Sequence, residues 1–151
     1  MGNERELSPL ARLLYALRKE EIAFQVAGMT AALLQGVPVT TLDADLWINL
    51  PERRYVRVLG ICQELGATIL ARTVVALSDN TFVNFFYRID GLEDFEAESG
   101  AVVKLDWLGL RVAVLPLQSI IKSKRAVARP KDIAHLPLLE QTLRVQRLPQ
   151  I

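Results

Sequence analysis

Two acidic residues, Asp43 and Asp45, are the residues of this 151-residue sequence best placed to do chemistry. They lie in a stretch, 42–50, whose alternating apolar residues predict a strand with acids on its other face. Side chains two apart on a strand emerge on the same face, and paired carboxylates repel each other unless a cation lies between them. Mg²⁺ binds one or two protein carboxylates together with substrate phosphates. The pair therefore predicts a site for Mg²⁺ or Mn²⁺, although two acids at a strand end that simply face water are the alternative.

A glycine upstream of the acids offers a second feature. The segment Val26-Ala-Gly28-Met29-Thr30 reads as a strand that runs into a glycine and then a helix. Backbone N–H groups at such a turn can hold a phosphate group. A plain strand-to-helix turn explains the same residues without a ligand.

Basic residues gather near the end of the chain. Residues 1–121 carry a net charge of −4, whereas residues 122–151 carry +5. The cluster consists of Lys122, Lys124, Arg125, Arg129 and Lys131, beside a helix expected to start at Pro130. These side chains could contact nucleotide phosphates or an RNA acceptor, or form a solvated helix face.

Three segments together resemble one known superfamily. The first runs Ala27-Gly28-Met29-Thr30, then Gly36-Val-Pro38-Val-Thr-Thr41-Leu-Asp43-Ala-Asp45-Leu46. The second is Asp90-Gly91-Leu92-x-x-Phe95, and the third runs from Val114 through Lys124 to Arg129-Pro130-Lys131-Asp132. In this order they resemble nucleotidyltransferases with the DNA-polymerase-β-like fold, above all the small bacterial branch related to abortive-infection toxins of the AbiEii type. The resemblance covers roughly residues 26–139.

That resemblance implies roles for particular residues. Asp43 and Asp45 would hold Mg²⁺ or Mn²⁺ and act in catalysis, with Asn84 at the third catalytic position. Nucleotide contacts would come from Gly28, Met29, Thr30, Thr41, Lys124, Arg129 and Lys131. The reaction would transfer a nucleoside monophosphate from an NTP to a hydroxyl of RNA, protein or a small molecule, and a cognate antitoxin is a possible partner.

Two departures from the family pattern bear on activity. The third acid of the superfamily is expected in Thr81-Phe-Val-Asn84-Phe-Phe-Tyr87, where Asn84 stands instead. An amide oxygen can bind a metal but supplies no charge and cannot act as a base. Asp106 is the nearest strand acid that could substitute, although it falls one strand too late.

The turn also reads Ala27-Gly28-Met29, where active members often carry Gly-Gly or Gly-Ser. A catalytically lapsed member that binds nucleotide or a partner is therefore the alternative hypothesis.

The elements that would position these residues alternate along the chain. Helices are expected after the Ser8-Pro9 cap and over 28–34, 51–65, 92–98, 118–127 and 130 to about 143. Strands are expected over 22–26, 42–50, 74–77, 82–89, 102–107 and 110–115, the last four as two hairpins. This order indicates an α/β (α+β) fold, a mixed β-sheet with flanking helices.

Length and composition bound the remaining possibilities. A chain of 151 residues that is 51% hydrophobic and 23% charged is typical of one folded domain, 1–151, with a core over about 22–115 and C-terminal helices over about 116–145. The lone Cys62 and the polar residues 1–6 favour a cytoplasmic protein without a signal peptide. The uncharged run 22–42 contains Gly36 and Pro38 and is therefore not expected to span a membrane. Cys62 and His135 are expected to be structural, because no second metal ligand or nucleophile motif accompanies them.

Overall fold

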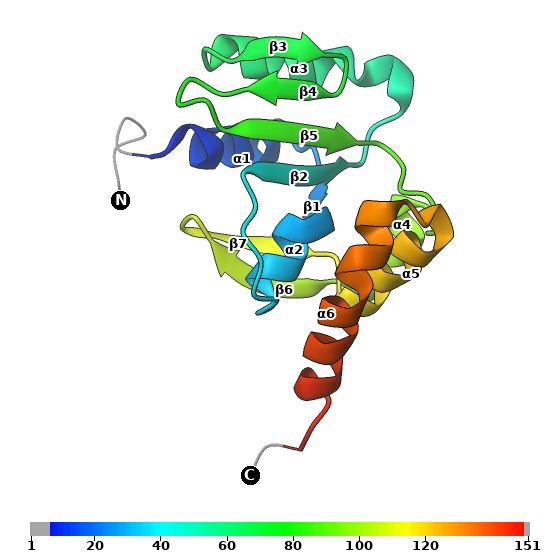
Figure 1. Ribbon diagram of the computed structural model, residues 1–151. Coiled ribbons are helices and arrows are strands. Elements are labelled where there is room, and N and C mark those ends of the chain that lie inside the picture. Colours follow the sequence, from blue (N-terminus) through cyan, green and yellow to red (C-terminus); the bar gives the residue numbers. More distant parts are fainter. Residues whose placement is uncertain (1–6, 150–151) are drawn as a thin grey trace.

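A computed structural model describes residues 7–149, and the polar N-terminal segment 1–6 lies outside the described residues. The strands form one mixed seven-stranded sheet in the order β3-β4-β5-β2-β1-β7-β6. Two pairings, β1 with β7 and β2 with β5, are parallel, and the others are antiparallel. Figure 1 traces this order from the green hairpin to the yellow one. The fold is thus the expected α/β architecture, a mixed sheet with flanking helices.

The bounds of the elements follow from local sequence. The strands are β1 (Phe24–Val26), β2 (Asp43–Ile48), β3 (Thr68–Ala71), β4 (Val74–Ala76), β5 (Phe82–Phe86), β6 (Val103–Trp107) and β7 (Leu110–Val114). The α-helices are α1 (Pro9–Lys19), α2 (Gly28–Leu34), α3 (Val56–Glu64), α4 (Phe95–Glu98), α5 (Leu117–Val127) and α6 (Pro130–Gln146). Short 3₁₀ turns, η2 (Glu52–Arg54) and η3 (Ser99–Ala101), precede α3 and follow α4.

Local sequence signals mark the starts of some of the helices. Ser8 caps α1 by accepting a hydrogen bond from the backbone N–H of Ala11 at 3.2 Å, and Pro9 is its first residue. The expected helix over 92–98 begins only at Phe95, because Asp94 is the N-cap and accepts from the N–H of Ala97. The expected helix over 51–65 is divided into η2 and α3.

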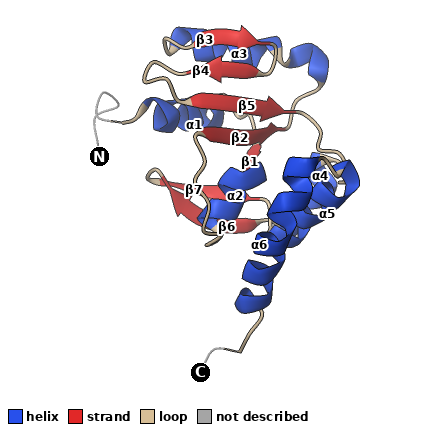
Figure 2. Ribbon diagram, viewed as in Figure 1, coloured by secondary structure: helices blue, strands red, loops and turns tan. Residues whose placement is uncertain are grey.

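Helices lie on both sides of the sheet. In Figures 1 and 2, α1 and α3 lie behind the sheet, whereas α2, α5 and α6 lie in front of its lower half. The front of β3, β4 and β5 carries no helix in this view. Within residues 7–149, none of the helices combines the length and apolar character needed to cross a membrane.

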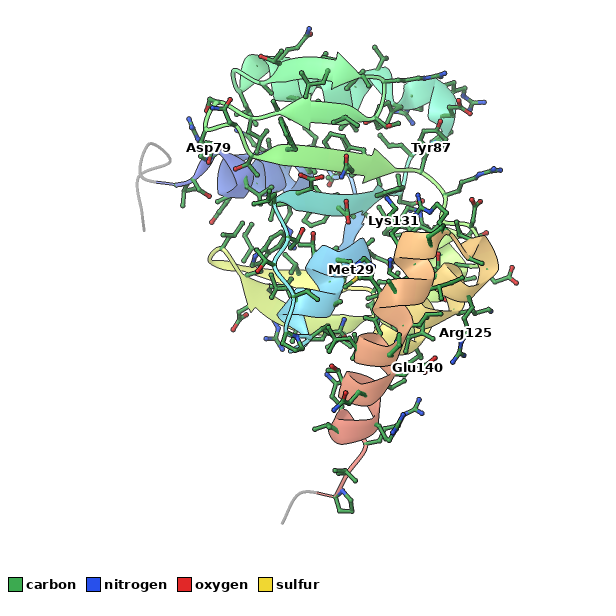
Figure 3. The ribbon with its side chains drawn as sticks, viewed as in Figure 1. Met29, Asp79, Tyr87, Arg125, Lys131 and Glu140 are labelled. Atoms are coloured by element: carbon green, nitrogen blue, oxygen red, sulfur yellow. The ribbon has the colours of Figure 1, made fainter. Side chains whose placement is uncertain are left out.

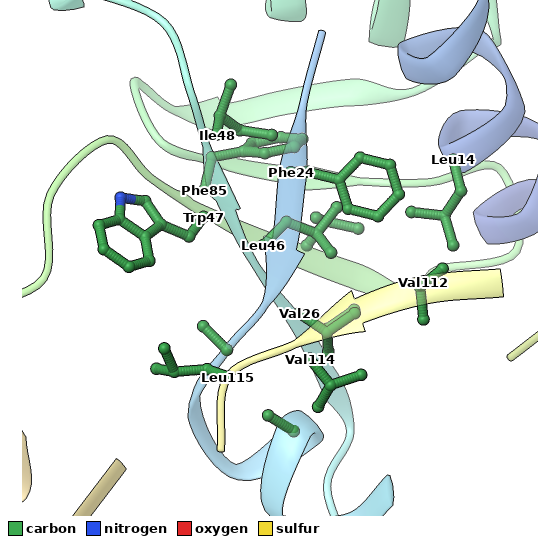
Figure 4. Packing of buried hydrophobic residues seen from close by; sticks show 14 of the residues in the cluster. Leu14, Phe24, Val26, Leu46, Trp47, Ile48, Phe85, Val112, Val114 and Leu115 are labelled. Carbon is green, nitrogen blue, oxygen red and sulfur yellow. The ribbon is translucent and has the colours of Figure 1, made fainter. Parts of the chain in front are cut away.

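The core fills the space between the central strands and α1. Leu46, Val26, Val112 and Val114 are fully buried, and they meet Leu14 of α1 beside Phe24 (Figure 4). Burial of such side chains stabilises the fold by about 1.5–3 kcal/mol each. Cys62 belongs to the same apolar cluster, and burial raises the pKa of its thiol to about 12. This core fixes β1, the strand that precedes Gly28, and β2, the strand that begins with the two acids.

Candidate active site

The two acids lie side by side on β2, and an amide from β5 faces them. Strands β2 and β5 are parallel and in register, with Asp43 opposite Phe82 and Asp45 opposite Asn84. The Asn84 side-chain amide donates to Asp45 Oδ1 at 3.0 Å and to Asp43 Oδ2 at 3.4 Å. The register thus places Asn84 where the sequence pattern led us to expect a third acid.

Burial and charge both act on Asp45. Burial raises the pKa of this carboxyl, and the neighbouring charge of Asp43 raises it further. The hydrogen bond from Asn84 and the charges of Lys124 and Lys131 act in the opposite direction. The site therefore favours a cation close to Asp45.

Gly28, the first residue of α2, lies directly against Asp45. It has φ +58°, and an added Cβ would lie 2.2 Å from Asp45 Oδ2. The preceding N–H, of Ala27, donates to the backbone oxygen of Asp45 at 2.9 Å. Only glycine fits here, since both the backbone conformation and the nearby carboxylate exclude a side chain.

Two threonines fix the backbone of the acid strand. The Thr30 hydroxyl donates to the Asp43 carbonyl at 2.9 Å and accepts from the Asp45 N–H at 3.2 Å. Thr41 donates to the same Asp43 carbonyl at 2.8 Å. Thr41 and Met29 line the cavity described below, whereas Thr30 is buried outside it. In this structure the Thr30 side chain therefore positions the acids and does not reach the cavity.

The basic wall of the site is built around a buried carboxylate, Asp132. It accepts from Lys124 Nζ at 3.0 Å and from Arg129 Nε at 2.7 Å, and it caps α6 by accepting from the Arg129 N–H. These contacts, led by the Arg129 hydrogen bond, hold the pKa of Asp132 well below its usual range despite burial. Asp132 therefore fixes the positions of Lys124 and Arg129.

The rest of the basic cluster divides between cavity and surface. Lys131 lines the cavity, and among residues 7–149 no carboxylate forms an ion pair with it. Arg125 points away and pairs with Glu140 of α6. Figure 3 labels Lys131 at the start of α6, Met29 on α2, and the Arg125–Glu140 pair between α5 and α6. Three of the five basic residues, Lys124, Arg129 and Lys131, thus reach the cavity.

These elements enclose a cavity of about 630 Å³ between the acid-bearing face of the sheet and helices α5 and α6. Its polar lining includes Asp43, Asp45, Asn84, Arg88, Asp90, Lys124, Arg129 and Lys131. The segment after β5 closes one end, where Ser123 of α5 donates to the Asp90 carbonyl at 2.7 Å. The volume is within the range of small-molecule sites.

Sequence patterns assigned no site role to several of the lining residues, among them Phe86, Arg88, Asp90 and His135. Phe86, Arg88 and Asp90 arrive with β5 and the segment after it, and His135 arrives with α6. Burial lowers the pKa of His135, as do the charges of Lys124 and Lys131, and its Nδ1 is buried without a hydrogen-bond partner among the described residues. His135, which the sequence led us to expect as a structural residue, is among the residues that line the cavity.

Asp106 lies outside the site. It belongs to β6, at the opposite edge of the sheet from β3, and forms an ion pair with Arg111 at 3.2 Å. Its side chain is 82% exposed. The structure therefore does not bring a third carboxylate from Asp106 to the acid pair.

The donor set fits a divalent cation completed by a substrate. Two carboxylates are hard oxygen ligands of the kind Mg²⁺ prefers, and Mg²⁺ takes its remaining ligands from phosphates and water. The Asn84 amide presents its N–H groups, not its oxygen, to the two acids. Within residues 7–149 no third acidic, histidine or cysteine ligand joins them. The two acids also lack an ion pair of their own among the described residues.

Solved structures share this architecture, while no family model and no curated protein matches the sequence. The antibiotic-resistance factor ANT(2'')-Ia aligns with TM-score 0.62 and 18% identity over 89% of this chain and 82% of its own. The lincosamide adenylyltransferase LnuA, bound to lincomycin, aligns with TM-score 0.59 and 8% identity over 90% and 98%. A Thermotoga maritima protein assigned to the nucleotidyltransferases aligns with TM-score 0.55 and 18% identity over 89% and 90%.

These structures define the fold of the chain as nucleotidyltransferase-like. At such low identities the likeness establishes the fold alone. Another structure of ANT(2'')-Ia holds adenylyl-2''-tobramycin, a nucleotidylated antibiotic. The neighbours therefore include an antibiotic adenylyltransferase and a structure that holds an adenylylated antibiotic, and the AbiEii-type branch is not among the three described above.

Proposed function

We propose that this protein is a nucleotidyltransferase that moves a nucleoside monophosphate from an NTP to a hydroxyl acceptor. The observation that carries the proposal is the placement of Asp43, Asp45 and Asn84 on one sheet face, opposite Lys124 and Lys131 across a single cavity. Acids that bind a metal and cations that bind phosphates are the two parts that phosphoryl transfer requires. The nucleotidyltransferase-like fold supports the same assignment.

The side chains around the cavity would have different roles in binding and transfer. Asp43 and Asp45 would hold Mg²⁺ or Mn²⁺, which when bound supplies charge stabilisation for the phosphates. Lys131, with Lys124 held by Asp132, would bind the triphosphate and offset its negative charge. Gly28, Met29 and Thr41 would shape the remainder of the nucleotide site, since all three line the cavity. Asn84 would orient the acceptor or the metal. It would not act as a base, because an amide takes up no proton.

Asn84 favours a second candidate function. Its amide donates to both carboxylates, so it satisfies the acid pair in part without a cation. A chain of this kind would bind nucleotide but transfer it poorly, and would act as a nucleotide sensor or an interaction module. Release of pyrophosphate from a bound NTP separates the two candidates, since only the transferase releases it.

The acceptor and any protein partner belong to the proposal as well. RNA, protein and small molecules all offer hydroxyl groups, and a cognate antitoxin would fit the AbiEii-like sequence motifs. Purification from the native host tests the antitoxin: a protein always recovered alone would contradict it.

A thermal-shift titration with each NTP tests the proposal. The parent should be stabilised only when Mg²⁺ or Mn²⁺ is present, by about 2.7 kcal/mol at a hundredfold excess over Kd. Asp43→Asn and Asp45→Asn should abolish that shift, because each removes a charge from the metal site while preserving shape. Asp106→Asn, at the exposed opposite edge, is the matched control and should behave like the parent. Equal shifts in all four proteins would show that the acid pair is not the site.

A further inference from the structure

The sheet face that carries the acids continues beyond them as an apolar surface. Backbone register aligns two rows across four strands: Thr68, Ala76, Phe82 and Asp43 in one, and Ala71, Val74, Asn84 and Asp45 in the other. Phe86 lies on the same face, two residues beyond Asn84. We name Phe82, Phe86, Val74, Ala76, Thr68 and Ala71 the apolar apron.

The two phenylalanines of this face are partly exposed, with the buried Ala76 and the half-buried Val74 beside them, whereas the opposite face of the same strands is packed against the core. Phe82 is 41% exposed and Phe86 37%, while the intervening Val83 and Phe85 are buried against the core. Figure 1 shows α1 and α3 behind these strands and no helix in front of them, and Figure 3 shows side chains standing free on that front. Exposed aromatic side chains beside a polar site are typical of a binding surface.

The apron meets the acids without a break. Asn84 lies between Phe82 and Phe86 along β5 and donates to both carboxylates. Phe86 lines the same cavity as Asp43 and Asp45. A molecule resting on the two rings would therefore extend over Asn84 to the acid pair.

The charge around the apron indicates what kind of molecule fits. None of its residues is charged, and the nearby arginines are paired, Arg72 with Glu52 at 3.1 Å and Arg88 with Asp90 at 3.9 Å. Among the described residues, the cation without a carboxylate partner that lines the cavity, Lys131, belongs to α6 and not to the apron. The apron thus offers apolar contact and no charge of its own, and in the described part of the chain the unpaired charges beside it are those of Asp43 and Asp45, which a bound metal would neutralise.

We propose that the apolar apron is the acceptor subsite, and that it takes a small neutral molecule with an apolar or aromatic face and a hydroxyl group. This inference rests on the proposed transferase function. The hydroxyl oxygen would bond to the α-phosphorus of the NTP as the bond from that phosphorus to the β-phosphate oxygen breaks. Pyrophosphate leaves, and the hydroxyl proton passes to solvent.

Two neutral glucosides test the apron without any nucleotide. Phenyl β-D-glucopyranoside and methyl β-D-glucopyranoside carry the same sugar hydroxyls. They differ only in the group on the anomeric oxygen, which is a phenyl ring in one and a methyl group in the other. By NMR titration the parent should bind the phenyl glucoside at least about tenfold more tightly, since a ring gains apolar and aromatic contact. Phe82→Ser, Phe86→Ser and the double variant should lower that preference toward one. Tyr15→Ser removes an aromatic side chain of similar exposure, 46%, from α1 behind the sheet and should leave it unchanged.

The outcomes separate this inference from the proposed function. Lack of preference in the parent, or an unchanged preference in the Phe variants, overturns the apron as an acceptor subsite. Phe-dependent binding of an octameric uridine oligonucleotide or of spermidine, stronger than that of the phenyl glucoside, would overturn the neutral acceptor and indicate a charged one. Asp43→Asn should still bind the phenyl glucoside, because the apron does not use that charge. Loss of NTP binding with an intact apron would therefore count against the transferase alone.

Discussion

Asn84 limits the negative charge of the site, because a neutral amide stands where an acid would add a third carboxylate. It stands opposite Asp45 in the parallel register of β2 and β5 and supplies two N–H donors where an acid would supply charge. A neutral third ligand weakens the hold on a divalent cation, yet it also relieves repulsion between the two carboxylates when no cation is bound. The same residue would thus lower the affinity for a metal and stabilise the metal-free protein.

Replacing Asn84 by Asp should raise the metal affinity and lower the stability of the metal-free protein. We expect metal affinity to rise about tenfold or more, because a third carboxylate faces the other two. Without metal the variant should unfold at a lower temperature than the parent. Calorimetric titration with Mn²⁺ and melting in a chelator measure both. Asn80→Asp adds the same charge in an exposed turn and should change neither. An unchanged affinity would mean that Asn84 does not face the metal.

Gly28 should tolerate no side chain. In Gly28→Ala the new methyl group would meet Asp45 Oδ2, so the carboxylate must move or the start of α2 must shift. We expect a loss of about 1–3 kcal/mol in the free energy of unfolding and loss of the metal-dependent NTP shift. Gly36→Ala has a similar positive φ, +96°, but open space around it. This control should keep NTP binding, and denaturant unfolding with NTP titration compares the two.

The start of α6 depends on the buried carboxylate of Asp132. Its pKa is held below the ordinary value near 3.8, so its contribution to stability is complete above that value and is lost as pH falls toward the folded-state pKa. Asp132→Asn should therefore cost about 3 kcal/mol at pH 7, since Lys124 is left nearly buried without its partner. The difference from the parent should shrink below about pH 4.

Urea unfolding of the parent and Asp132→Asn at pH 7 and pH 3 measures this contribution. Asp106→Asn breaks an exposed pair with Arg111 and should change stability little at either pH. A difference between parent and Asp132→Asn that grows toward pH 3 would contradict the assignment of the low pKa to Asp132.

Sequence patterns located most elements because their signals are local. The Ser8-Pro9 cap, the run from Gly28 to Leu34 and both hairpins are where periodicity and turn residues predict them. Strand β3 (Thr68–Ala71) was not predicted. It is an edge strand with three of its four residues exposed, so it lacks the alternation of apolar and polar residues that marks a half-buried strand.

The candidate site was predictable only where a single strand or a family motif carries it. Asp43 and Asp45 share a strand, and Asn84 was placed by motif, so their proximity followed from the sequence. Phe86 and His135 reach the cavity through the parallel pairing of β5 and the packing of α6. No short pattern encodes such contacts, since they depend on how distant segments pack together.

A contact between the segment after β5 and α5 joins the two walls of the cavity. Gly91 has φ +86°, and an added Cβ would lie 2.6 Å from Ala126 Cβ and 3.2 Å from Ser123 Cα. Gly91→Ala should push this segment away from α5 and weaken NTP binding about tenfold. Gly109→Ala carries the same backbone strain, at φ +82°, with no neighbour within 4 Å. If both variants bind NTP as tightly as the parent does, the close contact between Gly91 and α5 is not needed for NTP binding.

The burial of Cys62 has a practical consequence. It is the sole cysteine of the chain, it is fully buried, and its thiol pKa is near 12, so in the folded protein it should resist alkylating reagents. A cysteine introduced at a chosen surface position would then be the one reactive thiol. A pair of such cysteines, one at Thr68 of β3 and one at Glu140 of α6, carrying spin labels would report in solution whether a nucleotide draws α6 toward the sheet.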